Sequence, residues 1–415
     1  MRRALLPLDV VSTGGMGYGA RRMQPEPRTL ETGPPRELDA ALALAPRIRV
    51  AAERIETDRR LPPELVQALR EAGLFRMAVP RRFGGGEVDA ATMVRTIEAV
   101  AQADASAGWC VMIGATSGLV SAYLSDAAAT EIYRPEAITG GVFAPFGKAV
   151  AVDGGFRVTG RWPFASGCQH CDWLMGGCVV VDGGTLRLLP SGAPDSRMML
   201  VPARDAEIID TWAVSGLRGT GSHDVAVRDL FVPHARSASL LTDRPRQPGA
   251  LYVFPVFGLL AVGIAGVALG IARRAIDELV DLAKGKTPTG SRKRLGDRGV
   301  VQMQVAQAEA ALRAARALLF EAVAETWDAA RAQGEIAVRQ RALLRLAATH
   351  ATTSAVQAVD MMYTAGGGTS IYAGSPLQRC FRDIHVVTQH MMVATPTYEL
   401  TGRLFLGLDA DTSML

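Results

Sequence analysis

The chain has 415 residues, of which 48% are hydrophobic and 21% are charged, a composition typical of a folded globular protein. Its 45 basic and 41 acidic residues leave a formal net charge of only +4. No cluster of Lys and Arg with interleaved aromatic residues occurs, so nucleic acid is not an expected partner. A chain of this length is too long to fold around one small hydrophobic core, so two or three domains are expected.

The cysteines are few and odd in number, which is typical of a reducing cytoplasm and not of a disulfide framework. They are Cys110, Cys168, Cys171, Cys178 and Cys380. The segment 168–171 has the spacing of a zinc-binding pair, but no second pair follows at a suitable distance, so we expect a turn and no metal site. No run of 18 or more apolar residues occurs, so no membrane span is expected.

Residues 1–36 are rich in Gly, Pro and Arg without a helical period, which predicts a flexible tail. Residues 37–138 repeat Ala, Leu and charged residues at three- and four-residue spacing, which predicts an N-terminal helical domain. Within it, the glycine-rich segment 81–86 follows no strand and matches no nucleotide-binding pattern, so it indicates a turn.

The period changes between residues 139 and 240, where short alternating runs are separated by Gly-rich turns. This pattern predicts a middle β domain, a barrel or sandwich, with six to eight strands. Residues 241–415 are helical again and contain four long amphipathic helices, the last at 376–408 and interrupted near Pro396. They predict a four-helix bundle whose wide apolar stripes favour further helix contacts between subunits. The fold class is therefore α+β.

Two distant segments carry the chemistry. An aromatic strand at 161–167 ends in Ser166 and Gly167, and a helical segment near 382–390 carries His385 and His390. A hydroxyl at a strand end and an imidazole on a helix, more than two hundred residues apart, indicate one site assembled from two domains.

Four segments resemble landmarks of one family. They are "LPPELVQALREAGLFRMAVPRRFGGGEVD" at 61–89, "LRGTGSHDVAVRDLFVP" at 217–233, "VALGIARRAIDEL" at 267–279 and "YTAGGGTSIYAGSPLQRCFRDIHV" at 363–386. Together with the α, β, α order, they resemble the acyl-CoA dehydrogenase superfamily. The resemblance is closest to the branch of two-component monooxygenases that use reduced flavin.

This resemblance implies a flavin, FMN or FAD, between the β domain and the bundle, usually in a homotetramer. The strand at 162–167 would run beside the flavin ring, the segment at 218–222 would close around the phosphate, and a glycine turn would approach from a neighbouring subunit. The residues implied in cofactor binding are Trp162, Phe164, Ser166, Gly167, Arg218, Thr220, Ser222, Gly366, Gly367 and Gly368.

By the same resemblance, a separate reductase supplies the reduced flavin, and O₂ then oxygenates an apolar small molecule, aromatic or polycyclic. Ser166 and His390 match the family's catalytic positions, and Trp109, Thr116 and Ser117 lie where the substrate pocket is expected. His385 lies five residues from His390, about 140° round a helix, so the two do not face one site. We prefer His390.

Two alternatives remain. Tyr398-Glu399-Leu400-Thr401 resembles the late motif that supplies the base of the family's dehydrogenases, so Glu399 is a candidate base for acyl-thioester oxidation. Against this, Leu400 replaces the glycine that leaves room for substrate. A flavin-binding protein without turnover of either kind is the third possibility.

Overall fold

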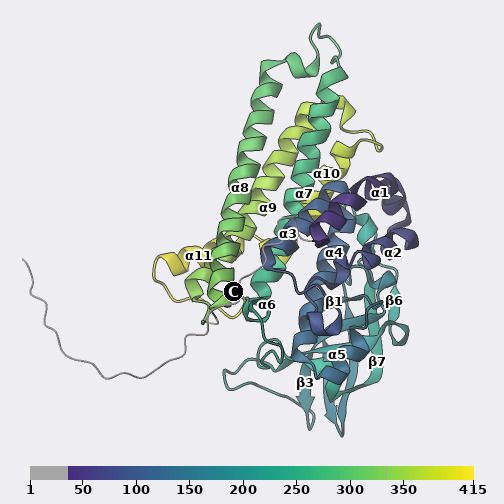
Figure 1. The fold of residues 1–415 in the computed structure, drawn as a ribbon, viewed down its shortest axis with the longest axis vertical. Coiled ribbons are helices and arrows are strands. Elements are labelled where there is room, and N and C mark those ends of the chain that lie inside the picture. Colours follow the sequence, from purple (N-terminus) through teal and green to yellow (C-terminus); the bar gives the residue numbers. More distant parts are fainter. Residues whose placement is uncertain (1–35, 333) are drawn as a thin grey trace, which may run out of the picture. The chain divides into compact units, whose positions relative to one another are not determined.

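The computed structural model describes residues 36–332 and 334–415. The predicted N-terminal tail falls almost entirely on residues 1–35, outside the described residues. From Arg36 onward the chain runs through helices, then a β-sheet, then helices again (Figure 1), as the changes of period predict.

Five α-helices and three short 3₁₀ helices form the N-terminal part. They are α1 (Arg36–Asp58), α2 (Pro63–Glu71), η1 (Leu74–Arg76), η2 (Arg81–Phe83), α3 (Ala90–Ala103), α4 (Ala105–Ser117), η3 (Gly118–Tyr123) and α5 (Asp126–Ile132). The start of α4 is fixed by Asp104, whose carboxylate accepts a hydrogen bond from the backbone N–H of Ala107 at 2.9 Å. Such a cap satisfies one of the free N–H groups of the first turn.

Eight strands form one sheet in the order β6-β7-β2-β1-β3-β5-β8, with β4 paired to β3. Strands β1 and β3 run parallel, and the other pairs are antiparallel. The strands are β1 (Thr139–Val152), β2 (Gly155–Trp162), β3 (Trp173–Asp182), β4 (Thr185–Leu186), β5 (Ser196–Pro202), β6 (Glu207–Ile209), β7 (Asp224–Pro233) and β8 (Ser237–Ala238), and short 3₁₀ turns η4 (Cys168–His170), η5 (Ala203–Asp205), η6 (Arg218–Thr220) and η7 (His234–Arg236) join them.

Trp162 fills the centre of the sheet's own core. Its indole packs where a Cβ on Gly147, Gly160 or Gly176 would come within 2.7 Å of the ring. Its Nε1–H donates to the carbonyl of Gly177 at 2.7 Å. Three glycines on three neighbouring strands therefore make room for one large side chain, which fixes the end of β2.

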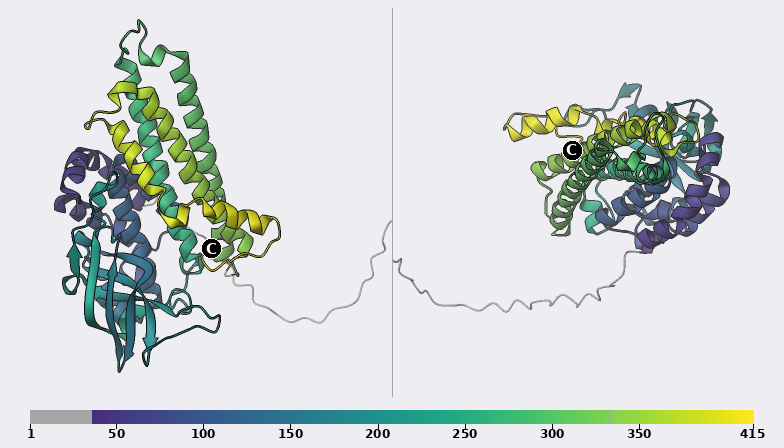
Figure 2. Two further views of the ribbon diagram at one scale, coloured as in Figure 1. Left: turned by 180° about the vertical axis from the view of Figure 1, so that it is seen from behind. Right: turned by 90° about the horizontal axis from the view of Figure 1, so that it is seen from above.

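The C-terminal part is a bundle of long helices, in which α7, α8 and α9 run side by side (Figures 1 and 2). Its elements are α6 (Ala250–Val253), α7 (Val256–Gly285), η8 (Leu295–Asp297), α8 (Gly299–Arg331), α9 (Val338–Gly366), η9 (Gly367–Thr369), α10 (Pro376–Val387), η10 (Met391–Val393) and α11 (Pro396–Phe405). The predicted last helix is therefore two helices. Pro396 occupies the first turn of α11, where its missing N–H is tolerated.

Two segments, Ala105–Tyr123 and Val256–Gly285, are long and apolar enough to cross a membrane. The protein itself covers them, with 94% and 83% of their most apolar windows buried. Gly270 in α7 explains the close packing, because a Cβ there would lie 2.5 Å from the carbonyl oxygen of Glu98 in α3. These segments are core helices.

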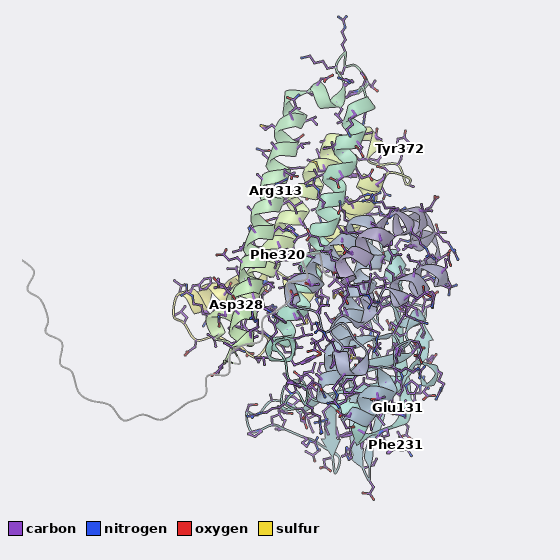
Figure 3. The ribbon with its side chains drawn as sticks, viewed as in Figure 1. Glu131, Phe231, Arg313, Phe320, Asp328 and Tyr372 are labelled. Atoms are coloured by element: carbon purple, nitrogen blue, oxygen red, sulfur yellow. The ribbon has the colours of Figure 1, made fainter. Side chains whose placement is uncertain are left out.

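One face of α8 is buried and the other is open. Its buried residues recur at spacings of mostly three and four, from Val301 to Ala330, which gives one stripe toward α9. Arg313, Phe320 and Asp328 are labelled along the middle and C-terminal part of this helix in Figure 3. Large apolar side chains are exposed at its start and in the loop after α9, namely Val300, Met303, Ile371 and Tyr372.

Candidate active site

The first half of the site is the turn after β2. Phe164 and Gly167 both have a positive φ, of 63° and 74°, so the chain turns sharply around Ser166. The backbone N–H of Ala165 donates to the carbonyl of His223 at 3.0 Å, and that of Gly167 donates to the carbonyl of Thr220 at 2.8 Å. The strand end is therefore fixed against the segment 220–223.

Three buried hydroxyl groups lie in a row at this turn. Ser166 Oγ and Ser222 Oγ are 2.7 Å apart, and Ser222 Oγ and Thr220 Oγ1 are also 2.7 Å apart. Thr220 Oγ1 donates to the carbonyl of Leu217 at 2.8 Å. From α4, the indole Nε1–H of Trp109 donates to Ser166 Oγ at 2.9 Å. We refer to Ser166, Ser222 and Thr220 as the hydroxyl chain.

The second half of the site is His390, which caps η10. Its Nδ1 accepts a hydrogen bond from the backbone N–H of Met392 at 3.2 Å. Because a backbone N–H can only donate, the proton of the neutral ring is on Nε2. Burial lowers the pKa of His390 to about 4, and the charge of Arg345 contributes in the same direction. The side chain is therefore a neutral hydrogen-bond donor at neutral pH.

Trp109 joins the two halves. Its ring lies edge-on to that of His390, with centroids 5.8 Å apart, while its Nε1–H is bonded to Ser166. The structure therefore brings Ser166 and His390 to one indole, although 224 positions separate them in the sequence. A shared site from two domains is the arrangement that the sequence predicts.

The predicted relation between the two histidines is wrong in one respect. Helix α10 ends at Val387, so His390 lies beyond the helix and not on it. His385 remains on α10, where its Nε2 lies 3.1 Å from a carboxylate oxygen of Asp360 and its ring is 4.5 Å from that of Phe381. The choice of His390 as the catalytic histidine stays a prediction, and the predicted angle round one helix no longer bears on it.

One buried carboxylate, which the sequence analysis did not predict, links the C-terminal bundle to the segment that carries the hydroxyl chain. Asp383 on α10 accepts a hydrogen bond from the backbone N–H of Leu217 at 2.6 Å. Burial raises the pKa of Asp383 to about 7, against the opposing effect of this hydrogen bond. The carbonyl of Leu217 also accepts the hydrogen bond of Thr220, the last member of the hydroxyl chain, so the bundle helix positions the segment that holds Ser222 and Thr220.

Comparisons with known proteins place this geometry in a family. Residues 40–138 match the acyl-CoA dehydrogenase N-terminal domain, and residues 262–395 match the acyl-CoA dehydrogenase C-terminal domain. The chain is 34% identical over 381 residues to an indole-3-acetate monooxygenase of Pseudomonas putida, covering 91% of this chain and 95% of that protein. The chain belongs to the acyl-CoA dehydrogenase superfamily.

Its branch is that of the flavin-dependent monooxygenases. The chain is 30% identical to the oxygenase component of an FADH₂-dependent resorcinol hydroxylase of a Rhizobium species, covering 93% of this chain and 98% of that protein. The solved structure of XiaF from a Streptomyces species, in complex with FADH₂ and glycerol, aligns with a TM-score of 0.83 at 29% identity, covering 90% and 95% of the two chains. The protein is a flavin-dependent monooxygenase, and its relatives include oxygenase components of two-component systems.

The residues of this monooxygenase fit a flavin. Phe164 is 65% exposed beside the site and meets Trp212 edge-on, with centroids 6.1 Å apart, which gives an open aromatic surface. A groove of about 740 Å³ begins at η6 and includes Arg218 and Arg379. Among the described residues, the buried Nε atoms of both arginines lack a hydrogen-bond partner, and Arg218 Nε lies 3.8 Å from a carboxylate oxygen of Glu56. An arginine N–H group without a hydrogen bond suits a phosphate.

Three predicted cofactor contacts lie differently from expectation. The Trp162 side chain is inside the sheet, so only its backbone is available to a flavin. The hydroxyls of Thr220 and Ser222 are bonded to each other, to Ser166 and to Leu217, and are therefore occupied by the protein and not free for a phosphate.

The glycines 366–368 lie at the end of α9, near the labelled Tyr372 in Figure 3 and away from the sheet. Gly367 has φ 55°, and Lys286 Nζ donates to the carbonyl of Gly366 at 2.5 Å. Within this chain they are not brought to Ser166.

The predicted substrate-pocket residues Thr116 and Ser117 differ in their hydrogen bonding. The hydroxyl of Thr116 donates to the carbonyl of Met112 on its own helix at 2.8 Å. Ser117 Oγ is fully buried and finds no hydrogen-bond partner in the part of the chain that the structure describes. Neither residue has exposed surface, so the structure does not place either hydroxyl at an open pocket.

Glu399 lies on the exposed side of α11, whereas Thr397 and Thr401 of that helix are buried. The structure does not place it beside Ser166 or Trp109, and the dehydrogenase alternative gains no support from it. As for metals, no three His, Cys, Asp or Glu side chains of the described residues could hold an ion. The thiols of Cys168 and Cys171 instead donate to the carbonyls of Gly221 and Gly167.

Proposed function

We propose that this monooxygenase receives reduced FMN or FAD from a separate reductase and uses O₂ to oxygenate an aromatic small molecule. The observation that carries the proposal is the contact of one indole, Trp109, with both Ser166 and His390. The names of two relatives, an indole-3-acetate monooxygenase and a resorcinol hydroxylase, support an aromatic substrate.

The reduced flavin, when bound, supplies the two electrons with which O₂ becomes an oxygen donor. Ser166 would offer its oxygen to the polar edge of the ring, and Phe164 an aromatic surface. Ser166, Trp109 and Ser222 are each less than 10% exposed, so the reacting atoms would be kept from water. Exclusion of water suppresses loss of the activated oxygen as peroxide.

His390 would orient the substrate. Its pKa near 4 keeps the ring neutral, and Nδ1 is bonded to the Met392 N–H. The free group is therefore Nε2–H, which can donate to a phenol oxygen or to another acceptor on the substrate. This arrangement supports an orienting role in preference to proton abstraction, because the nitrogen that would accept a proton is occupied.

We further propose a homotetramer in the cytoplasm. The glycines 366–368 and the exposed side chains of Ile371 and Tyr372 lie together after α9. Exposed apolar residues beside a backbone turn suit contact with a neighbouring subunit, and the open face of α8 is a second candidate. Size-exclusion chromatography with light scattering tests the stoichiometry, and a monomer at micromolar concentration would contradict it.

The function is tested with reduced flavin. The protein is mixed anaerobically with photoreduced FMN or FAD, then with O₂ in a stopped-flow spectrometer, with indole-3-acetate and resorcinol as probe substrates. A transient absorbing species distinct from reduced and oxidised flavin is expected. Smooth reoxidation without it, together with bleaching of oxidised flavin by an acyl-CoA, would overturn the proposal.

Ser166→Ala sharpens the same test. Loss of one buried hydrogen bond should shorten the lifetime of the transient species up to about tenfold and raise the yield of H₂O₂. The matched control is Thr96→Val, which removes a buried hydroxyl that bonds only to its own helix in α3. The control should leave lifetime and peroxide yield unchanged.

A further inference from the structure

The direction of every hydrogen bond in the hydroxyl chain follows from its last member. Thr220 Oγ1 contacts the carbonyl of Leu217, which can only accept, so the single hydroxyl hydrogen of Thr220 is used there. Thr220 must then accept from Ser222 across 2.7 Å. Ser222 has no second hydrogen, so it must accept from Ser166 across the other 2.7 Å contact.

The other end of the chain agrees with this direction. The indole of Trp109 can only donate, and it donates to Ser166 Oγ. The hydrogen of Ser166 therefore cannot turn toward Trp109. Ser166 is left with its hydrogen bonded to Ser222 and one lone pair occupied by Trp109, while its other lone pair has no partner among the described residues.

We infer that the hydroxyl chain makes Ser166 a hydrogen-bond acceptor toward the flavin and thereby selects the reduced cofactor. The two redox states of a flavin differ at ring nitrogen N5, which carries a hydrogen when reduced and only a lone pair when oxidised. If Ser166 faces N5 as an acceptor, it accepts a hydrogen bond from N5–H of the reduced ring. With the oxidised ring, the lone pair of Ser166 faces the lone pair of N5, and no hydrogen bond forms. The inference rests on the proposed function, because it requires a flavin beside Ser166.

Selective binding of the reduced flavin would serve the catalytic cycle. An oxygenase that receives its flavin from a separate protein must bind the reduced form and release the oxidised one after each turnover. If binding depends on the N5 hydrogen, the protein binds the reduced flavin and releases the oxidised flavin without a conformational change. Ser222 and Thr220 act through Ser166, so they are positioning residues in this scheme.

The test compares two substitutions at Thr220. Thr220→Val keeps the shape but removes the acceptor for Ser222, whose hydrogen can then turn to Ser166. The hydrogen of Ser166 becomes free to bond to N5 of the oxidised ring. Thr220→Ser keeps the hydroxyl and should preserve the direction.

The quantity measured is the ratio of the Kd of oxidised FMN or FAD to that of the photoreduced form, by anaerobic fluorescence or calorimetric titration. Wild-type protein and Thr220→Ser should favour the reduced form. The ratio should fall about tenfold in Thr220→Val, the effect of one mispaired buried group. Ser222→Ala, which removes the acceptor for Ser166 directly, should lower the ratio by a similar factor.

The outcomes are distinguishable. If wild-type protein binds neither form, the proposed function fails, and this inference fails with it. If wild-type protein binds flavin but Thr220→Val leaves the ratio unchanged while weakening both forms equally, Thr220 has only a structural role and the inference is overturned. Thr96→Val is again the control, with an unchanged ratio.

Discussion

The two halves of this site are built in opposite ways. On the β side, Ser166, Ser222 and Thr220 form a closed series in which each hydroxyl hydrogen has an acceptor. On the bundle side, His390 has one ring nitrogen bonded to a backbone N–H. Its other nitrogen has no partner in the stretches that the structure describes, and it is a free donor.

On the bundle side, a buried cation adds to the effect of burial in lowering the pKa of His390. Arg345 is buried in α9 and donates to the carbonyl of Met414, but its Nε has no partner among the described residues. A satisfied set of neutral groups is rigid and insensitive to pH, whereas a neutral imidazole beside a buried cation resists protonation. The difference suggests that the β side serves the same cofactor at every turnover and the bundle side serves the substrate.

Removing the free donor should have the largest effect. His390→Ala should lower the rate of product formation by about a hundredfold to a thousandfold, the effect of losing one donor at a reacting group. The affinity for reduced flavin should change little, because the hydroxyl chain is intact. Product formation is measured by chromatography under a fixed supply of reduced flavin.

His390→Asn is the companion variant, since its side-chain oxygen can still accept from Met392. The asparagine variant should retain the fold of η10. It should lose activity because the asparagine side chain is shorter than histidine and does not place a donor where Nε2–H lies. Equal loss of flavin affinity and of activity in both variants would show that the halves are not separate in function.

The pH dependence of stability should distinguish His390 from the hydroxyl chain, because an imidazole titrates between pH 4 and 7 whereas the hydroxyl groups do not. The pKa of His390 is lowered from 6.5 to about 4, so the unfolded chain binds more protons than the folded one between these values. Stability therefore falls as pH decreases from about 6.5 to 4, by up to about 3 kcal/mol for this residue.

The measurement is the free energy of unfolding of wild type minus that of His390→Asn, by denaturant titration from pH 4 to pH 8. The buried His170, whose pKa burial also lowers to about 4, is present in both proteins and cancels. The difference should be flat above pH 7. Ser222→Ala should show no pH dependence of its own, and a slope in that variant would break the comparison.

The order of helices and strands could be predicted from the sequence, because the spacing of apolar residues depends only on residues close together in the chain. The change from helix to strand near residue 139 and the return to long helices after residue 240 were predicted from the spacing of apolar residues alone. Ser166 and His390 were also identified, although the role of each residue remains a prediction. The sheet order and the pairing of β1 with β3 depend on contacts between distant segments, which no local pattern encodes.

The misses have a similar cause. Trp162 was expected at the cofactor, but three glycines on separate strands make room for it in the core. Glu399 was expected as an alternative base, but which face of α11 is buried depends on its packing against α9. The contact between Thr220 and Ser222 was not predictable from their spacing, because it depends on the 3₁₀ turn η6 and on the positive φ of Gly221, 51°.

The smallest predicted effect concerns the tie between the halves. Asp383→Ala should reduce the free energy of unfolding by about 2 kcal/mol, because the N–H of Leu217 would be left buried and unpaired. Asp383→Asn keeps an oxygen acceptor and should cost less than about 1 kcal/mol at pH 7.

The pKa of Asp383 is raised to about 7, so its contribution to stability is complete below about pH 4 and is lost as pH rises through 7. Relative to Asp383→Asn, wild type should therefore become less stable between pH 4 and 8, opposite in sign to the His390 comparison. If the tie positions the hydroxyl chain, Asp383→Ala should also lower the selectivity for reduced flavin, whereas Asp383→Asn should not. A loss of stability in the Ala variant with unchanged selectivity would show that Leu217 is held in place without α10.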